Sequence, residues 1–277
     1  MKQHNVRAGA AAMLACMMLA AGCSPKGAGV EGLDKLGEVH ALSREAGSGT
    51  RASFDELADI IAEDENLTVV KSTDDMHAEI GKDASAIGYL TDAAADEKIK
   101  VLKVDGKEIT DRKYPLIRKV YLVSRSDAND LEKEFITYVQ GKGQDIVAGS
   151  FEQLNSSVTF LSMKPEGRIV IGGSTTVSPV MKELAEAYMK ENPNAQIEVV
   201  STDSSDGITG TMNGTYDLGM SSRDPKSFEK ELVNFNAIGQ DRIAIAVSKD
   251  NPLEDITTSQ LDKIYTGKVR NWADLNK

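Results

Sequence analysis

Short apolar segments alternate with amphipathic segments along most of the chain after residue 36. The apolar segments predict strands at residues 39–43, 67–71, 87–90, 119–124, 168–171, 197–200 and 242–248. The amphipathic segments predict helices at residues 51–63, 75–81, 131–140, 179–191, 226–233 and 259–265. Ser178 suits the N-cap of the fourth helix, and Pro179 suits its first turn. The alternation of strands and helices favours an α/β fold with largely parallel sheets.

Two apolar strands that carry basic residues, at residues 114–125 and 239–249, are candidates for crossings between two lobes. A length of 277 residues suits one large domain or two medium ones. The alternative is that both segments are ordinary sheet strands, and the sequence leaves this open.

The first 23 residues have the pattern of a secretion signal. Lys2 and Arg7 precede an apolar run at residues 8–21, which is too short to span a bilayer comfortably. The run ends in LAAGC at residues 19–23, which resembles a bacterial lipobox; the alternative is an ordinary signal peptide that contains a cysteine. We expect residues 1–22 to be removed, Cys23 to carry the lipid, and residues 23–36 to form a flexible tether on the extracytoplasmic face of the cell membrane.

Composition narrows the classes of function. The net charge of −11 argues against nucleic acid, although a small anion site depends on local groups rather than total charge. The chain has 2 cysteines, of which Cys16 lies in the removed segment, and 3 histidines that are scattered, so we predict no metal and no other cofactor. No P-loop lysine follows Gly49, and neither a nucleophile elbow nor a carboxylate pair is evident, so we predict no catalytic residue.

The loop at residues 43–51 (SREAGSGTR) is a candidate anion site, because it leads directly into a predicted helix. Its glycines let the backbone wrap closely around a ligand, and the helix start offers free N–H groups. Ser48 and Thr50 add hydroxyl donors, and Arg44 adds a forked cation. The alternative is an N-capping loop with a surface arginine.

Two further loops have the same character, at residues 172–179 (GGSTTVSP) and 201–207 (STDSSDG), and a strand at residues 217–223 (DLGMSSR) ends in hydroxyls and an arginine. Each could be an ordinary loop between a strand and a helix. Because ligands of open α/β sheets bind where such loops converge, we expect the loops to meet around one ligand.

Together these segments resemble a known family. SREAGSGTR, GSTTVSP (residues 173–179) and IYTGKVRNWADL (residues 264–275) are similar to motifs of the phosphate-binding lipoproteins of bacterial phosphate ABC importers, and the likeness covers roughly residues 37–277. The resemblance implies a two-lobed, periplasmic-binding-protein-like fold with a hinge. It also implies that phosphate is captured in the inter-lobe cleft and delivered to ABC permease and ATPase subunits.

The order of the motifs differs from that of the family, in which GSTTVSP comes first and the NW-x-x-L segment leads into SREAGSGTR. Joining residue 277 to about residue 37 restores the family order, so we expect a circular permutation. Lobe one would then be residues 119–241, and lobe two residues 37–118 plus 242–277. A fragment completed by a second copy or a swapped dimer is the alternative.

The resemblance also implies which residues bind phosphate. They are Arg44, Ser48, Gly49 and Thr50 from lobe two, and Ser174, Thr175, Thr176, Ser204, Asp206 and Ser222 from lobe one. Ser222 stands where well-known members have an aspartate that accepts the phosphate proton, so Asp206, with Glu45 second, is the candidate acceptor. Asp206 as a helix N-cap is the alternative. Alternatives for function are a related oxyanion such as sulfate or molybdate, or a surface-tethered sensor or adhesin without transport.

Overall fold

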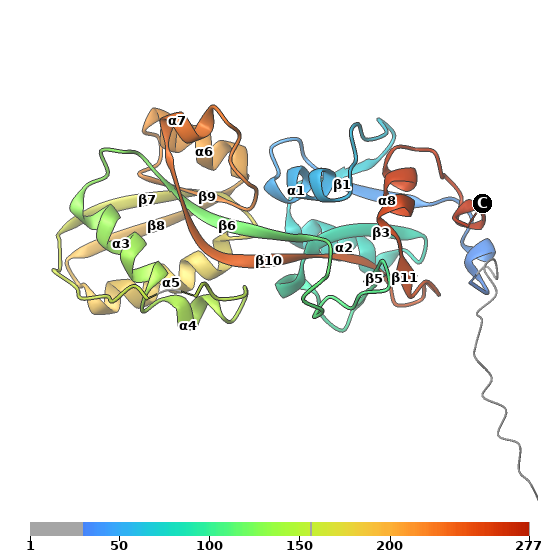
Figure 1. Cartoon of the computed structure of the whole chain (residues 1–277), viewed down its shortest axis with the longest axis horizontal. Helices are drawn as coiled ribbons and strands as arrows, with labels where there is room; N and C mark the ends of the chain where they lie inside the picture. The colour runs from blue at the N-terminus through green and yellow to red at the C-terminus, as the bar shows by residue number, and fades with distance from the viewer. Residues whose placement is uncertain (1–29, 156, 277) are drawn as a thin grey trace, which may run out of the picture.

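The computed structural model describes residues 30–155 and 157–276, so the predicted signal peptide and Cys23 lie outside the described residues. Two lobes of mixed α/β structure lie side by side, and two long strands run from one to the other (Figure 1). The two-lobed α/β fold predicted from the sequence is therefore confirmed.

The strands and helices match most of the predicted segments. The strands are β1 His40–Arg44, β2 Thr68–Val70, β3 Ala86–Thr91, β4 Ile99–Val101, β5 Lys103–Val104, β6 Ile117–Ser124, β7 Gly167–Ser174, β8 Ala195–Thr202, β9 Leu218–Ser221, β10 Asn234–Ser248 and β11 Asp255–Ile256. The α-helices are α1 Gly49–Leu57, α2 Thr73–Lys82, α3 Asp130–Gln140, α4 Gln144–Val147, α5 Ser178–Glu191, α6 Ser204–Asn213, α7 Glu229–Leu232 and α8 Thr258–Tyr265. Short 3-10 helices are η1 Leu33–Leu36, η2 Asp92–Ala94 and η3 Trp272–Asp274.

The main sheet runs through both lobes in the order β2-β1-β3-β10-β6-β9-β7-β8. The strands are parallel at each end, where β1 pairs with β2 and β3, and β7 with β8 and β9. They are antiparallel in the middle, where β10 pairs with β3 and β6, and β6 with β9. The expectation of largely parallel sheets thus fails in the middle, because the two crossing strands run in opposite directions.

The crossing strands are β6 and β10, as the sequence predicted. The first part of β10 pairs with β6 along residues 234–242, and residues 243–247 pair with β3 in the other lobe. A buried ion pair joins the two strands, with 2.6 Å between Arg118 Nη2 and Asp241 Oδ2. Thr91, at the end of β3, donates to Asp241 at 2.7 Å. A buried polar network therefore ties the two crossing strands to one lobe.

Each lobe has its own apolar core. One core contains buried side chains from residues 33–116 and 243–275, and the other contains side chains from residues 120–238. In the first core, Phe54 of α1 stacks on Tyr89 of β3 with 4.1 Å between ring centroids, and its edge meets Tyr265 of α8 at 4.7 Å. This aromatic packing fixes α1 on its lobe, which matters because α1 begins in the candidate anion loop.

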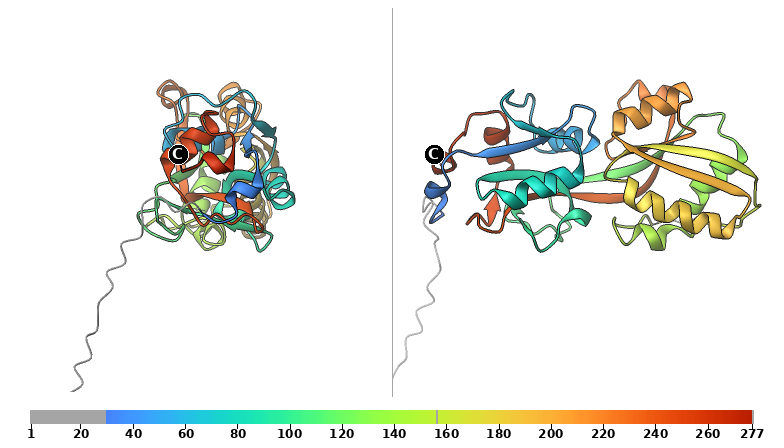
Figure 2. Two further views of the ribbon diagram at one scale, coloured as in Figure 1. Left: turned by 90° about the vertical axis from the view of Figure 1, so that its right-hand side faces the viewer. Right: turned by 180° about the vertical axis from the view of Figure 1, so that it is seen from behind.

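The two ends of the described chain are hydrogen-bonded to each other. Val39 donates its amide to the Arg270 carbonyl at 3.0 Å, and Trp272 donates to the Gly37 carbonyl at 3.0 Å. The end-on view shows the two terminal segments together on the outer end of one lobe (Figure 2). They lie far from the junction of the lobes.

Two helix boundaries differ from the sequence-based expectation. The first helix ends at Leu57 rather than residue 63, because Asp59 adopts a left-handed conformation with φ 58°. Helix α5 begins at Ser178 itself, and its N-cap is Val177, so Ser178 does not cap the helix. The early end of α1 and the start of α5 at Ser178 both change which residues lie near the candidate site.

Candidate functional site

The predicted loops meet at the junction of the two lobes. Arg44 ends β1 and Gly49 begins α1 in one lobe, whereas Ser174 ends β7 and Ser204 begins α6 in the other. Four hydrogen bonds cross between the lobes here. They join Arg44 Nη2 to Thr175 Oγ1 (3.1 Å), Thr50 Oγ1 to Thr176 Oγ1 (3.0 Å), Ser53 Oγ to the Ser222 carbonyl (3.2 Å), and the Ser205 amide to the Gly47 carbonyl (3.2 Å).

Arg44 provides a buried positive charge at this junction, with 2% of its surface exposed. Its Nε and Nη2 donate to the Glu45 carboxylate at 2.9 and 2.8 Å, and Nη2 also lies 3.4 Å from the Lys71 carbonyl. These contacts fix the plane of the guanidinium, so its orientation toward Thr175 is set before any ligand arrives.

Three buried serines form a hydroxyl cluster opposite Arg44: Ser174, Ser204 and Ser222. Ser174 Oγ donates to Ser222 Oγ at 3.0 Å, Ser204 and Ser222 hydroxyls lie 3.3 Å apart, and the Ser222 amide donates to Ser204 at 3.1 Å. A hydroxyl rotates to serve as donor or acceptor, so this cluster can redirect its protons to an oxyanion.

The start of α1 approaches the hydroxyl cluster very closely. Ser48 caps the helix by accepting from the Arg51 amide at 3.3 Å. A Cβ added at Gly49 would overlap Ser204 Oγ and lie 2.7 Å from Ser222 Oγ. The glycine thus lets a helix N-terminus, which carries partial positive charge, reach the opposite lobe.

Asp206 is the predicted residue that the structure does not bring to this junction. It is exposed, and its carboxylate accepts from the Tyr216 hydroxyl at 2.9 Å. It does not cap α6 either, because Asp203 accepts from the Asp206 amide at 2.8 Å. Glu45 is therefore the carboxylate of the two candidates that lies beside Arg44.

Sequence reasoning missed Ser53 and Asp203. Ser53 follows Gly49 by one helical turn, so its position on the same face of α1 was available from the spacing. Asp203 directly precedes the two serines that begin α6, which is an N-cap pattern. Its carboxylate lies against Gly47 of the other lobe, where an added Cβ would be 2.5 Å away.

An acidic pair, buried Glu63 and half-buried Asp55, lies next to the Arg44 loop. Glu63 accepts from Ser43 Oγ at 2.7 Å and pairs with Arg51 Nη2 at 2.8 Å. Arg51 Nη1 in turn donates to the Arg44 carbonyl at 3.0 Å. Burial, and then the charge of Glu63, raise the pKa of Asp55 from 3.8 to about 7.

Asp55→Asn should therefore remove a pH dependence of stability. Between about pH 4 and pH 7 the folded wild type binds a proton that the unfolded chain does not, so its free energy of unfolding falls as pH rises through that window. Relative to the wild type, the variant should gain about 1–2 kcal/mol between pH 4.5 and pH 8 in chemical denaturation. Asp59→Asn, at an exposed position past the same helix, is the control. Parallel pH profiles for Asp55→Asn and the wild type would contradict the assignment.

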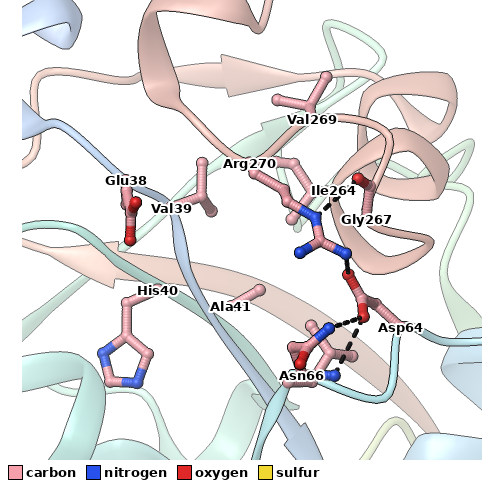
Figure 3. Close-up of a pocket in the computed structure, with 11 residues that line it drawn as sticks. Glu38, Val39, His40, Ala41, Asp64, Asn66, Ile264, Gly267, Val269 and Arg270 are labelled. Carbon is pink, nitrogen blue, oxygen red and sulfur yellow. Dashed lines mark hydrogen bonds and ion pairs between the residues drawn. The ribbon is translucent and has the colours of Figure 1, made fainter.

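A separate cavity of about 210 Å³ lies at the outer end of the same lobe, between the terminal segments and residues 64–67 (Figure 3). There Arg270 pairs with Asp64 at 2.5 Å, and the Asn66 amide also donates to Asp64. Hydrogen bonds from Asn66 and the Arg270 charge lower the pKa of Asp64. The lining also includes Glu38, so carboxylates outnumber the one arginine, and the cavity is a weaker candidate for an anion site than the junction of the lobes.

Residues 30–155 and 157–276 contain no helix long and apolar enough to cross a membrane. Within the same ranges, no three histidine, cysteine, aspartate or glutamate side chains are grouped to hold a metal ion.

Comparison with known proteins gives one consistent result. A family model described as a PBP superfamily domain matches residues 161–277. The chain is 35% identical over 260 residues to phosphate-binding protein PstS 2 of Streptococcus agalactiae, covering 87% of this chain and 89% of that protein. It is 32% identical over 253 residues to phosphate-binding protein PstS 2 of Streptococcus pneumoniae, covering 85% and 87%.

A solved structure agrees with these matches. The crystal structure of a phosphate ABC transporter phosphate-binding protein from Streptococcus pneumoniae superimposes with a TM-score of 0.70 at 32% identity, covering 86% of this chain and 100% of that one. The likeness thus extends over both lobes, and the chain belongs to the family of PstS-like phosphate-binding proteins.

Proposed function

We propose that this protein captures inorganic phosphate between its lobes and delivers it to the permease and ATPase subunits of an ABC importer. The observation that carries the proposal is the convergence of buried Arg44, the start of α1 and the hydroxyl cluster at the junction of the lobes. The relatives named above are phosphate-binding proteins, which supports the same ligand.

The chemistry of the site suits a dehydrated oxyanion. A buried dianion loses its water contacts, and each one must be replaced by a donor from the protein. In this proposal Arg44 supplies the charge, and Ser48, Gly49 and Thr50 donate from the start of α1. Ser174, Thr175, Thr176, Ser204 and Ser222 donate from the other lobe. In the phosphate complex, bonds through the ligand join the direct hydrogen bonds in holding the lobes together, and β6 and β10 act as the hinge on which the lobes close.

Glu45 is the proposed basis of selectivity for phosphate over sulfate. Phosphate keeps a proton at neutral pH and sulfate does not, so a carboxylate near the anion accepts a hydrogen bond from one and repels the other. Both oxygens of the Glu45 carboxylate accept from the Arg44 guanidinium, and 22% of the side chain is exposed, so in this proposal their remaining lone pairs accept from a ligand held by Arg44.

Calorimetric titration with phosphate, sulfate and molybdate tests the proposal. We expect phosphate to bind with the highest affinity and with one tight site per chain. No heat with any of the three oxyanions would contradict the proposed function, and a preference for molybdate or sulfate would correct the ligand.

We also propose that the chain is circularly permuted relative to family members in which GSTTVSP comes first, with lobe one at residues 119–241 and lobe two at residues 37–118 plus 242–277. The hydrogen bonds between the terminal segments support this, because a join there needs little rearrangement. The division of the two cores supports the boundaries at the crossing strands, whereas buried Leu33 extends the core of lobe two into the segment expected to be a flexible tether. A chain joined at its ends and reopened in the segment before β7 should bind phosphate within about threefold of the natural chain. A rejoined chain that folds but does not bind would contradict it.

The location follows from the predicted N-terminal signal. We propose that the protein is held on the extracytoplasmic face of the membrane by lipid on Cys23, since this is where an importer receives its solute. Metabolic labelling with palmitate tests this; incorporation that persists in Cys23→Ser would contradict it.

A further inference from the structure

A second polar cavity adjoins the candidate phosphate site. Its volume is about 150 Å³, and it lies where the start of α2 in one lobe faces the start of α5 in the other. Its lining residues are Ser72, Thr73, Asp74, Thr175, Ser178, Pro179, Lys182 and Ser201. The cavity therefore contains residues of both lobes.

Two buried hydroxyls of this cavity have no partner. Thr73 and Ser178 are 7% and 2% exposed, and neither Thr73 Oγ1 nor Ser178 Oγ makes a hydrogen bond with any described residue. A buried hydroxyl without a partner is unfavourable, and nearly all such groups in folded proteins find one. Two of them in one cavity indicate that the cavity accommodates a polar ligand.

The electrostatics of the cavity favour an anion. Thr73 is the first residue of α2 and Ser178 the first of α5, and these helices have 10 and 14 residues. First-turn amides have no acceptor within their own helix and carry partial positive charge. Pro179 of α5 has no N–H, and Ser72 Oγ already accepts from the Asp75 amide of α2 at 2.9 Å, so the remaining first-turn amides are the ones available to a ligand. Lys182 adds a full positive charge, and Asp74 is the one acidic residue of the lining.

The cavity lies within reach of Arg44. The Arg44 guanidinium donates to Thr175 Oγ1, which belongs to the cavity lining, at 3.1 Å. It also lies 3.4 Å from the carbonyl of Lys71, the residue directly before Ser72. A ligand group held by Arg44 and a group in the cavity would thus be neighbours, with Thr175 between them.

We propose that this cavity is a second oxyanion subsite, in which Thr73, Ser178, Lys182 and the two helix starts hold a second phosphate group. That group is either the far end of a diphosphate whose first group lies on Arg44, or a second free phosphate ion. Asp74 accepts a hydrogen bond from the protonated oxygen of hydrogen phosphate, which disfavours sulfate. The diphosphate case rests on the proposed function, whereas binding of a free ion in the cavity does not.

Calorimetric titrations with inorganic phosphate, pyrophosphate and sulfate test the subsite. The variant is the double substitution Thr73→Val and Ser178→Ala, which removes both free hydroxyls and no residue assigned to the first site. We expect it to lose at least tenfold in affinity for pyrophosphate while its tight binding of phosphate stays within twofold of the wild type. If a free ion fills the subsite, the wild type shows a second, weaker phase of phosphate binding that is absent with sulfate. The double variant then loses this phase.

Lys182→Gln is the second variant, because Lys182 is exposed and its substitution leaves the fold intact. This variant should weaken pyrophosphate binding, or the second phase of phosphate binding, about threefold or more. The proposal therefore stays testable if the double variant fails to fold. Pyrophosphate and second-phase phosphate binding that match the wild type in the folded variants would overturn the subsite. Absence of tight phosphate binding in the wild type would instead contradict the proposed function, and the response of the weaker phase of phosphate binding to the variants would still decide the subsite.

Discussion

Arg44→Met should lower the affinity for phosphate about 100-fold or more. Arg44 is 2% exposed, and its guanidinium is oriented by Glu45 and directed at Thr175. A hydrogen bond to a charged group contributes about 1.5–3 kcal/mol, and the arginine fork supplies more than one. A loss of about 3 kcal/mol corresponds to about 100-fold in affinity. Calorimetric titration with phosphate measures it directly.

Two further variants separate the role of charge from that of geometry. Arg44→Lys keeps the charge without the planar fork, so it should bind more tightly than the methionine variant and more weakly than the wild type. Arg270→Met removes a cation that is 66% exposed at the outer end of the lobe, and it should leave the affinity unchanged. If Arg44→Met, Arg270→Met and the wild type bound phosphate equally well, Arg44 would not be a ligand.

The sequence predicted the candidate site better than it predicted the sheet, for a physical reason. A loop that cradles an anion is local: its glycines, hydroxyls and helix start lie within nine residues, as in the segment at residues 43–51. The pairing of β10 with both β6 and β3 is a contact between distant segments. Apolar runs predict that these strands exist, and they do not predict which neighbour is antiparallel.

Asp206 shows the limit of reading side-chain roles from a motif. It lies within the same serine-rich segment as Ser204, yet two residues along a helix turn a side chain by about 200°. Once Asp203 caps α6, Ser204 faces the junction of the lobes and Asp206 faces Tyr216 and solvent. The first residue of α6 determines the roles of both Ser204 and Asp206. The sequence pattern did not predict that first residue to within one position.

The sequence pattern also did not predict that Glu63 supports the Arg44 loop, because this contact depends on where α1 ends. The pattern extended the helix to residue 63, which would have placed Glu63 on the helix surface. The left-handed Asp59 ends the helix earlier, and the chain then returns so that Glu63 meets Ser43 and Arg51. Aspartate tolerates that conformation less readily than glycine, so the sequence gives little warning of it.

Gly49→Ala should prevent the two lobes from closing fully on phosphate. The added Cβ would overlap Ser204 Oγ and lie 2.7 Å from Ser222 Oγ, so the start of α1 must retreat from the hydroxyl cluster. Gly49 does not have a positive φ, so alanine fits the helix itself and the lobe should fold normally. Overpacking of this kind costs about 1–3 kcal/mol, which corresponds to about 5- to 150-fold in affinity.

Small-angle scattering with and without phosphate, together with calorimetry, measures both consequences. The wild type should become more compact with phosphate, whereas Gly49→Ala should stay closer to the ligand-free dimensions. Gly81→Ala in α2 is the matched control, because the nearest atom to its added Cβ is 3.9 Å away and alanine is the better helix former by about 0.5–1 kcal/mol. Wild-type affinity and compaction in Gly49→Ala would mean that the ligand is not gripped by the start of α1. The anion would then be held by side chains alone, and the closeness of α1 to Ser204 and Ser222 would serve only the packing of the lobes.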